Sequence, residues 1–173
     1  MGDKTEIYSK FSFRKANIDD LEQLISLGVV AYQEYANFLT PENWNVFKAG
    51  LSNKASRITL IEMSEVFVCA YDNKVIGMAY WIPSGQQWDV FQSDWSYIRM
   101  VGVHPDYRGF GIGQKLMKQC INLARQKAEK IVALHTSELM FAARHIYDTL
   151  DFKIKKELEP RYGMRYWLYT LAL

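Results

Sequence analysis

A short glycine-rich run has the residue types to bind an anion. The run Arg108-Gly109-Phe110-Gly111-Ile112-Gly113 follows an apolar, β-branched stretch that ends at Val103 and a turn over residues 104–107. Three glycines within five positions allow the backbone to curl tightly and to approach a ligand closely. The helical pattern that begins at Gln114 would direct free N–H groups and the positive end of a helix dipole at the loop. The sequence therefore predicts an anion site, most naturally for phosphate.

Two other phosphate-binding loops fit this run poorly. A nucleoside-triphosphate loop needs Gly-x-x-x-x-Gly-Lys-Ser/Thr, and the sequence contains no such run. A dinucleotide fingerprint needs Gly-x-Gly-x-x-Gly, whereas these glycines are spaced two apart. That fingerprint also needs an acidic residue about 20 positions further on, at the end of a strand, and Glu129 precedes the next apolar run instead. A glycine-rich turn without a ligand would leave Arg108 and the three missing side chains unexplained.

The segment from Val103 to Gly113 resembles the acetyl-CoA-binding signature of the GNAT superfamily of N-acetyltransferases. The core of that signature is Arg or Gln, two residues, Gly, one residue, and then Gly or Ala. Arg108, Gly111 and Gly113 fill this pattern. The resemblance implies that acetyl-CoA is the cosubstrate and that the chain is an acetyl-CoA-dependent N-acetyltransferase.

A second motif resembles the same family. Ala143-x-x-x-Tyr147-x-x-x-Asp151-Phe152 is similar to the family's Ala-x-x-x-Tyr-x-x-x-Gly-Phe ending. Asp151 stands where glycine is usual, and Met140 stands where many members carry an asparagine. The likeness covers nearly the whole chain. It implies a single GNAT-like domain over residues 1–173, of the α+β class, with a mixed, mostly antiparallel central sheet of about seven strands and helices on both faces.

The resemblance also implies how the cosubstrate is held. The backbone N–H groups of residues 108–113 would cradle the pyrophosphate of CoA, while the side chain of Arg108 would brace the loop. The pantetheine arm would pair with the preceding strand as an extra strand. The N–H of Val101 would polarise the thioester carbonyl and stabilise the tetrahedral oxyanion. The expected cofactor-binding residues are Met100, Val101, Val103, Arg108, Gly109, Phe110, Gly111, Ile112 and Gly113.

Tyr147 is the expected general acid, because the departing CoA thiolate needs a proton that a nearby phenol can supply. Without the resemblance, an aromatic residue at helical spacing beside Ala143 and Leu150 would be interpreted as core. The general base is not fixed, since the strand over residues 97–103 carries no carboxylate. The open alternatives are Glu34, Asp89, Asp94, His135 and a water chain that ends at a backbone carbonyl.

Aromatic residues beside acids mark the expected acceptor site. They lie in residues 32–44 and 88–95, two segments that the resemblance places near the acceptor. Aromatic faces with one or two carboxylates suit a small cationic amine, although the same residues could simply cover a sheet edge. The expected acceptor-binding residues are Tyr32, Glu34, Tyr35, Trp88 and Asp94. We expect direct attack by a neutral primary amine of a small molecule. A protein or peptide amine and a non-catalytic CoA-binding sensor are the alternatives.

The spacing of apolar residues predicts the elements that position these groups. Strands are expected over residues 11–13, 66–71, 75–81, 97–103, 131–134, 152–158 and 164–173. Helices are expected over residues 21–35 after a cap at Asn17 or Asp19, from Thr40-Pro41 to about residue 50 or 55, over residues 112–128, and after a cap at Ser137. Hairpins mixed with crossovers predict one mixed sheet. The apolar last strand could pair with a second copy in a homodimer or lie inside the sheet.

Composition argues against several other classes of protein. The chain has 173 residues, of which 49% are hydrophobic and 23% charged, as is usual for one globular domain. A net charge of +2 gives no strong field for nucleic acid. No apolar run approaches the roughly 20 residues that span a membrane, and the polar start is unlike a signal peptide. Cys69 and Cys120 fit buried free thiols without a metal-ligand partner. We therefore expect a soluble, cytoplasmic protein that uses no metal.

Overall fold

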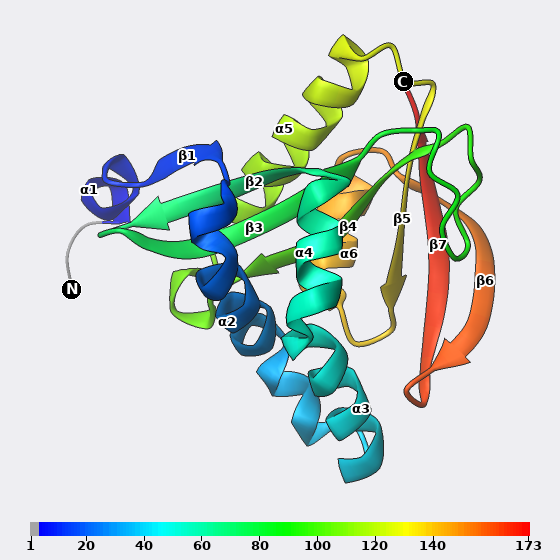
Figure 1. Ribbon diagram of the computed structural model, residues 1–173, viewed down its shortest axis with the longest axis horizontal. Helices are drawn as coiled ribbons and strands as arrows, with labels where there is room; N and C mark the ends of the chain where they lie inside the picture. The colour runs from blue at the N-terminus through cyan, green and yellow to red at the C-terminus, as the bar shows by residue number, and fades with distance from the viewer. Residues whose placement is uncertain (1–3) are drawn as a thin grey trace.

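The computed structural model describes residues 4–173, which form one seven-stranded sheet with helices on both sides (Figure 1). The strands are β1 (Ser12–Lys15), β2 (Glu65–Tyr71), β3 (Lys74–Ile82), β4 (Ser96–Val103), β5 (Ile131–Ser137), β6 (Lys153–Arg161) and β7 (Met164–Ala172). Their order in the sheet is β1-β2-β3-β4-β5-β7-β6, and all pairs are antiparallel except β4 with β5. The predicted mixed, mostly antiparallel sheet is confirmed.

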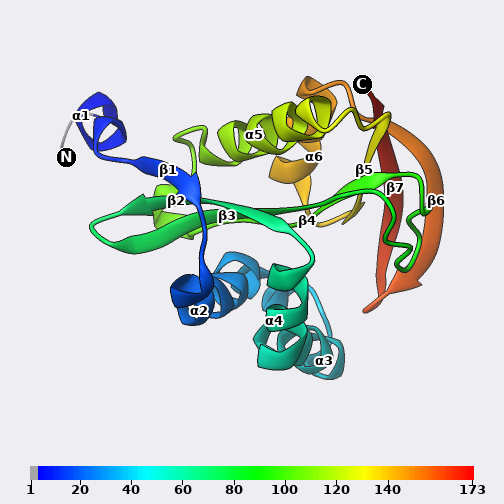
Figure 2. The same cartoon turned by 45° about the horizontal axis from the view of Figure 1, so that its top comes forward.

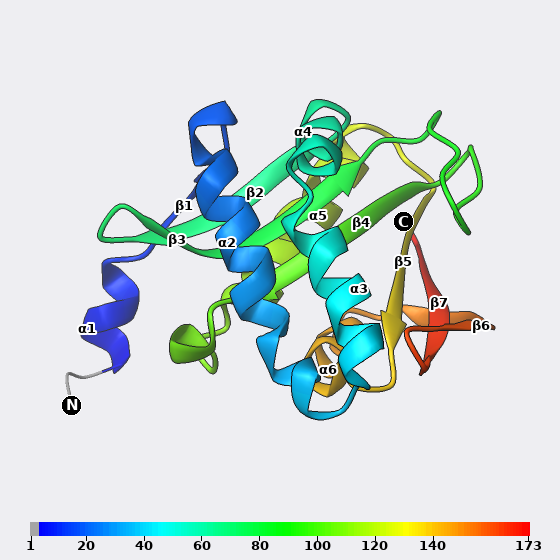
Figure 3. The ribbon, with the colours of Figure 1, turned by 60° about the horizontal axis from the view of Figure 1, so that its bottom comes forward.

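Helices cover the two faces of the sheet in separate groups (Figures 2 and 3). One face carries α2 (Leu21–Tyr32), α3 (Pro41–Ser52) and α4 (Lys54–Glu62), and the other carries α5 (Ile112–Gln126) and α6 (Phe141–Thr149). A short α1 (Lys4–Ser9) precedes β1, and 3-10 turns occupy η1 (Ile18–Asp20), η2 (Gln33–Asn37) and η3 (Pro105–Tyr107). Each face buries its own apolar cluster, as the alternation of side chains along strands requires.

The sequence signals for α5 and α3 act as expected. In α5 the positions Ile112, Leu116, Cys120 and Ala124 are all buried, which gives this helix its apolar face. At the start of α3 the Thr40 side chain accepts the N–H of residue 43 at 3.2 Å, and a proline takes the first helical position.

Two helical segments differ from the prediction. The first helix ends at Tyr32 and continues only as the 3-10 turn η2. The second predicted helix is α3, which ends at Ser52, but the helix α4 that follows it was not predicted. Asn53 separates the two, because it leaves the helical conformation at ψ 107° and its side chain caps α4 by accepting the Ser56 N–H at 2.8 Å. Asn17 caps η1 instead of α2. The short helix α1 was not predicted.

The strand pairing corrects one prediction at the C-terminal end and decides between the two alternatives for the last strand. Ser137 does not cap a helix: it is the last residue of β5 and pairs with Tyr166, and α6 begins four residues later. The last strand, β7, pairs with β5 on one side and β6 on the other. It therefore has no free edge with which to pair with a second copy.

The cysteines lie where the composition suggests. Cys69 and Cys120 are buried and free, and burial raises the pKa of the Cys69 thiol to about 12. Among residues 4–173, no helix has the length and apolar character needed to cross a membrane. The same residues hold no cluster of three or more His, Cys, Asp or Glu side chains arranged for a metal ion.

Candidate active site

The site begins where β4 and β5 separate. These parallel strands are paired only at Ser96 with Val132 and at Tyr97 with Ala133. From Ile98 onward the edge of β4 that faces β5 pairs with no other strand of the described chain, while its opposite edge stays bonded to β3. Unpaired N–H and C=O groups along a strand edge are ready to bind an extended ligand.

A bulge in β4 sets the direction of its side chains. Ala79 of β3 is opposed by two residues of β4, Met100 and Val101, and Met100 has a φ of 53°. Arg99 pairs with Tyr80 and faces α2–α4. Because of the extra residue, Met100 faces the same side, whereas Val101 packs toward α5. The bulge therefore places two neighbouring side chains on the same face of the sheet.

The glycine loop places backbone N–H donors beside the open edge of β4. Gly111 caps α5 with φ 73°, and Gly109 has φ 79°, a region that glycine enters without strain. A Cβ added at either position would meet nothing within 4 Å, so the space beside the loop is open. The first bond inside α5 runs from the Lys115 N–H to the Gly111 carbonyl at 3.0 Å. The N–H groups of residues 112–114 therefore have no acceptor within the helix.

Glycine is needed at position 113 for a different reason. A Cβ at Gly113 would lie 3.1 Å from the Cδ1 of Ile146 in α6. Gly113 therefore lets α5 pack closely against α6. The sequence analysis explained the three glycines by the close approach of a ligand. At Gly113 the group that approaches closely is a side chain of α6.

The Arg108 side chain braces the loop. Its guanidinium donates one bond of 2.8 Å to the Glu34 carboxylate and another of 2.8 Å to the Ala31 carbonyl. Both partners belong to the end of α2 or the turn that follows it. The side chain is thus engaged within the protein, and the loop's backbone groups are left for a ligand.

The loop, the open edge of β4 and the aromatic residues line one cavity of about 1510 Å³. Eight of the predicted cofactor residues line it: Met100, Val101, Val103, Arg108, Gly109, Gly111, Ile112 and Gly113. Phe110 instead packs against the cluster on the α5 face. Four of the predicted acceptor residues also line the cavity, namely Tyr32, Glu34, Tyr35 and Trp88. Asp94 is exposed and lies outside the lining.

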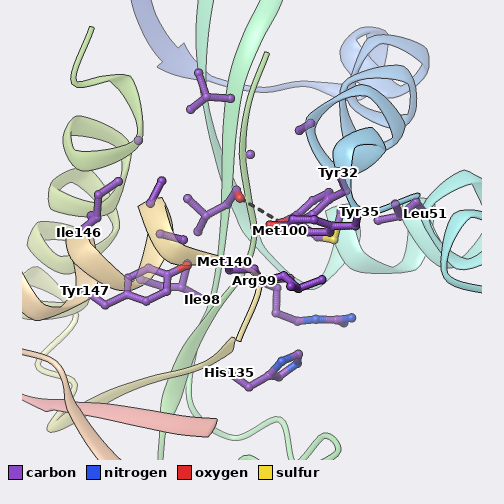
Figure 4. A pocket seen from close by; sticks show the side chains of 18 of the residues that line it. Tyr32, Tyr35, Leu51, Ile98, Arg99, Met100, His135, Met140, Ile146 and Tyr147 are labelled. Atoms are coloured by element: carbon purple, nitrogen blue, oxygen red, sulfur yellow. Dashed lines mark hydrogen bonds between the residues drawn. The ribbon is translucent and has the colours of Figure 1, made fainter. Parts of the chain in front are cut away.

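Tyr147 lies in α6 on the α5 side of the cavity. Its hydroxyl points toward the middle of the cavity, across β4 from Tyr32 and Tyr35 (Figure 4). The ring packs 6.0 Å from Phe152 and 6.1 Å from Tyr169 between centroids. Burial raises the pKa of the Tyr147 phenol well above its usual value. The phenol therefore carries its proton throughout the physiological range and can act as a donor.

Tyr32 anchors the β4 bulge. Its hydroxyl donates a bond of 3.0 Å to the Val101 carbonyl, the dashed line in Figure 4. The Tyr32 phenol is buried, which raises its pKa to about 12 and keeps it protonated. This contact fixes the peptide that follows Val101, close to the N–H that the sequence assigned to the thioester.

The four candidate bases have different surroundings. Asp89 makes a two-bond ion pair with Arg161, at 2.6 and 2.9 Å, and Glu34 is paired with the loop arginine. His135 lines the cavity, and its buried Nδ1 has no hydrogen-bond partner. Burial, with the nearby positive charges of Arg161 and Arg99, lowers the His135 pKa to about 4, so the imidazole is neutral at neutral pH. The exposed Asp94 stands apart from all of these groups.

Three arginines that line the cavity, Arg57, Arg99 and Arg161, were missed by the sequence analysis. Arg57 of α4 is 4% exposed and donates to the Leu51 carbonyl at 3.0 Å, while its Nε has no partner. Arg99 of β4 lies with its guanidinium carbon 3.6 Å from the centre of the Trp88 ring. The only signal for Arg99 was a lone charge in an otherwise apolar strand, and Arg57 had no distinguishing pattern at all.

Comparison with known proteins identifies the family. Residues 30–152 match the family described as the acetyltransferase (GNAT) family. The probable N-acetyltransferase camello of Xenopus tropicalis is 31% identical over 107 residues, covering 61% of this chain but 47% of that protein. An uncharacterized N-acetyltransferase of Archaeoglobus fulgidus is 26% identical over 145 residues, covering 81% of this chain and 91% of that protein. The chain thus matches about half the length of the first relative and most of the second.

Solved structures agree on the fold. The PaiA N-acetyltransferase from Thermoplasma acidophilum, in complex with coenzyme A, superposes with a TM-score of 0.77 at 16% identity, covering 94% of this chain and 99% of that one. An N-acetyltransferase from Staphylococcus aureus Mu50 gives 0.71 at 19% identity, covering 94% and 98%. These superpositions show that the chain has the fold of these N-acetyltransferases. The chain belongs to the acetyltransferase (GNAT) family.

Proposed function

We propose that this chain transfers the acetyl group of acetyl-CoA to a primary amine of a small molecule by direct attack. One observation carries the proposal: the open edge of β4, the glycine loop and the Tyr147 hydroxyl all face a single cavity. Direct transfer needs donor, acceptor and acid to be held together in this way.

The donor would be held mainly by backbone groups. The free N–H groups at the start of α5 and the open space beside Gly109 and Gly111 suit the pyrophosphate. The unpaired edge of β4 suits the pantetheine amides, and the Val101 N–H would polarise the thioester carbonyl.

The acceptor would enter from the side covered by α2–α4. Its nitrogen adds to the acetyl carbon to give a tetrahedral intermediate, which collapses as the carbon–sulfur bond breaks, and the amine proton passes to water. Tyr147 donates its proton to the departing thiolate and regains one from solvent. Aromatic side chains line this half of the cavity, and the Asp89–Arg161 pair links the β3–β4 connection to the end of β6. These features favour a small acceptor over a polypeptide.

Replacing Tyr147 with Phe tests the proposal. The Tyr147→Phe variant should lose turnover by roughly 100- to 10,000-fold, because the thiolate would leave without a positioned acid. Its affinity for CoA, measured by calorimetry, should stay close to that of the wild type. Thiol release with a panel of amines reports turnover.

A matched control comes from the ring beside it. Tyr169 is also buried, but it does not line the cavity, so Tyr169→Phe should keep its turnover. Unchanged turnover in Tyr147→Phe would refute the acid role. A failure of the wild-type protein to release thiol with any amine would refute the proposed function and favour a CoA-binding sensor.

A further inference from the structure

The geometry points to an anion-binding subsite formed by Arg57 and Arg99 on the acceptor side of the cavity, so that the acceptor is an amine that also carries a carboxylate, as in an α-amino acid. This inference rests on the proposed function and narrows its substrate class. It departs from the small cationic amine that the aromatic and acidic residues of the sequence suggested.

The charges that line the cavity are unbalanced. Its two carboxylates, Glu34 and Asp89, are each already paired with an arginine, at 2.8 and 2.6 Å. Arg57 and Arg99 have no carboxylate within 4.0 Å in the part of the chain that the structure describes. Two positive charges therefore face this space without a carboxylate in contact, and Asp89, which acts on Arg99 at longer range, is already paired with Arg161. A cationic amine such as a polyamine would be repelled there.

Burial makes the missing counterion costly. The Arg57 side chain is 4% exposed and donates to the Leu51 carbonyl, its guanidinium carbon lies 5.5 Å from the centre of the Tyr80 ring, and its Nε has no acceptor. A buried charge without a partner destabilises the protein unless something supplies the opposite charge. A ligand carboxylate would accept the free donors of Arg57 and restore that balance.

Arg99 is held in place for the same task. Its guanidinium lies 3.6 Å from the centre of the Trp88 ring, and such stacking orients the donor fork while leaving its edge free. Desolvation is the main cause that lowers the Arg99 pKa, with a further contribution from the positive charge of Arg57. At about 10, that pKa still leaves the guanidinium charged at neutral pH.

The position of Arg99 along β4 fits a short acceptor. Arg99 lies two residues before Val101, whose N–H is proposed to bind the thioester. At a rise of about 3.3 Å per residue, the two positions are separated by at most about 7 Å. That spacing suits an amine and a carboxylate a few bonds apart. The CoA phosphates would lie at the other end of β4, at Gly109 and beyond, so they do not account for Arg99.

The experiment compares acceptors that differ only at the carboxyl group. Apolar L-α-amino acids, their carboxamides and the corresponding decarboxylated amines are assayed by thiol release. The wild-type protein should prefer the amino acid by at least roughly 10-fold in kcat/KM. Arg99→Gln should lower kcat/KM for the amino acid by roughly 10- to 100-fold, mainly through KM, and should leave the amide and the amine unchanged. Arg125→Gln, an exposed change on α5, is the matched control and should alter none of the three.

A second measurement does not depend on turnover. With CoA present, the amino acid should raise the thermal midpoint of the wild-type protein, and Arg99→Gln should abolish that shift. Arg57→Gln should behave alike if it folds, and the Arg99 variant decides the matter if it does not. Equal use of amides, polyamines or a peptide would overturn the subsite while leaving acetyl transfer intact. Absence of thiol release with every acceptor, and of any ligand-induced shift, would overturn both.

Discussion

The two halves of the cavity are built in different ways. The half proposed for the cofactor comes from one continuous stretch, residues 100–113, and offers mainly backbone N–H and C=O groups. The half proposed for the acceptor is assembled from side chains on α2, α4, the β3–β4 connection, the start of β4, β5 and the end of β6. A ligand shared by a whole family can be bound through the backbone of a short motif. A ligand particular to one member needs side chains from distant parts of the chain.

The halves also differ in how they handle charge. In the cofactor half, anions would be stabilised by helix and peptide dipoles, and the Arg108 side chain is occupied by protein partners. In the acceptor half the charges belong to arginines and carboxylates, of which two arginines lack an acidic partner. The first half should therefore be sensitive to backbone shape and the second to side-chain charge.

The largest effect is expected from a change of backbone shape in the cofactor half. Gly111→Val forces a β-branched residue into a φ of 73° and fills the open space beside the loop. CoA affinity, measured by calorimetry, should fall by roughly 100-fold or more. Amino acid binding to the acceptor half, followed by thermal shift without CoA, should change little.

Gly85→Val provides the control for strain alone. Gly85 also has a positive φ, 94°, with nothing within 4 Å of an added Cβ, and it lies outside the cavity lining. The two variants should lose similar stability, roughly 1 to 3 kcal/mol. Equal losses of CoA affinity in both would show that the Gly111 effect is general destabilisation.

Charge in the acceptor half should appear in the pH dependence of stability. His135 has its pKa lowered from about 6.5 to about 4, mainly by burial and then by Arg161 and Arg99. Between these two values the unfolded chain binds a proton that the folded chain refuses, so stability falls as pH drops from about 6.5 to about 4. His135→Gln should remove that part of the loss, on the order of 1 to 3 kcal/mol, in urea unfolding at pH 7.5 and 5.

The groups around His135 do not add a second pH dependence between about pH 6.5 and about pH 4. Asp89 faces it from the β3–β4 connection, Tyr166 lies 5.8 Å away between ring centroids, and Phe91 stacks at 5.7 Å. Asp20 and Glu157 have lowered pKa values, so the stability that their carboxylates contribute is lost only as the pH falls below the ordinary carboxyl pKa, near 4. Parallel pH profiles for His135→Gln and the wild type would contradict a neutral, buried imidazole.

The sequence could predict more of the cofactor half of the cavity than of the acceptor half. The glycine loop and the run of apolar positions in α5 are local patterns, and the structure places them as expected. Most of the sheet could be predicted as well, because its strands alternate or are continuously apolar. The helix α4 was missed because its start is marked only by the single cap at Asn53.

The acceptor half could not be predicted because it depends on pairings between distant residues. Glu34 and Asp89 seemed free to bind a cation, yet each is neutralised by an arginine more than 70 positions away. Met100 lies on the same face as Arg99 only because the bulge resets the alternation of β4. Neither the ion pairs nor the bulge is marked by a local sequence pattern. The negative charge that the sequence analysis assigned to binding the acceptor is therefore used in ion pairs within the protein.

The smallest effect is expected at Arg108, where the two halves meet. Arg108→Gln removes both bonds that tie the loop to the end of α2, and a looser loop should weaken CoA binding by roughly threefold to tenfold. Glu34→Gln leaves the bond to the Ala31 carbonyl and should have a smaller effect. The CoA dissociation constants of the two variants are measured by calorimetry at low and moderate salt. A loss of 100-fold in Arg108→Gln would contradict a bracing role, because only direct contact with a CoA phosphate could account for it. In that case both halves would rely on side-chain charge, and the distinction between them would fail.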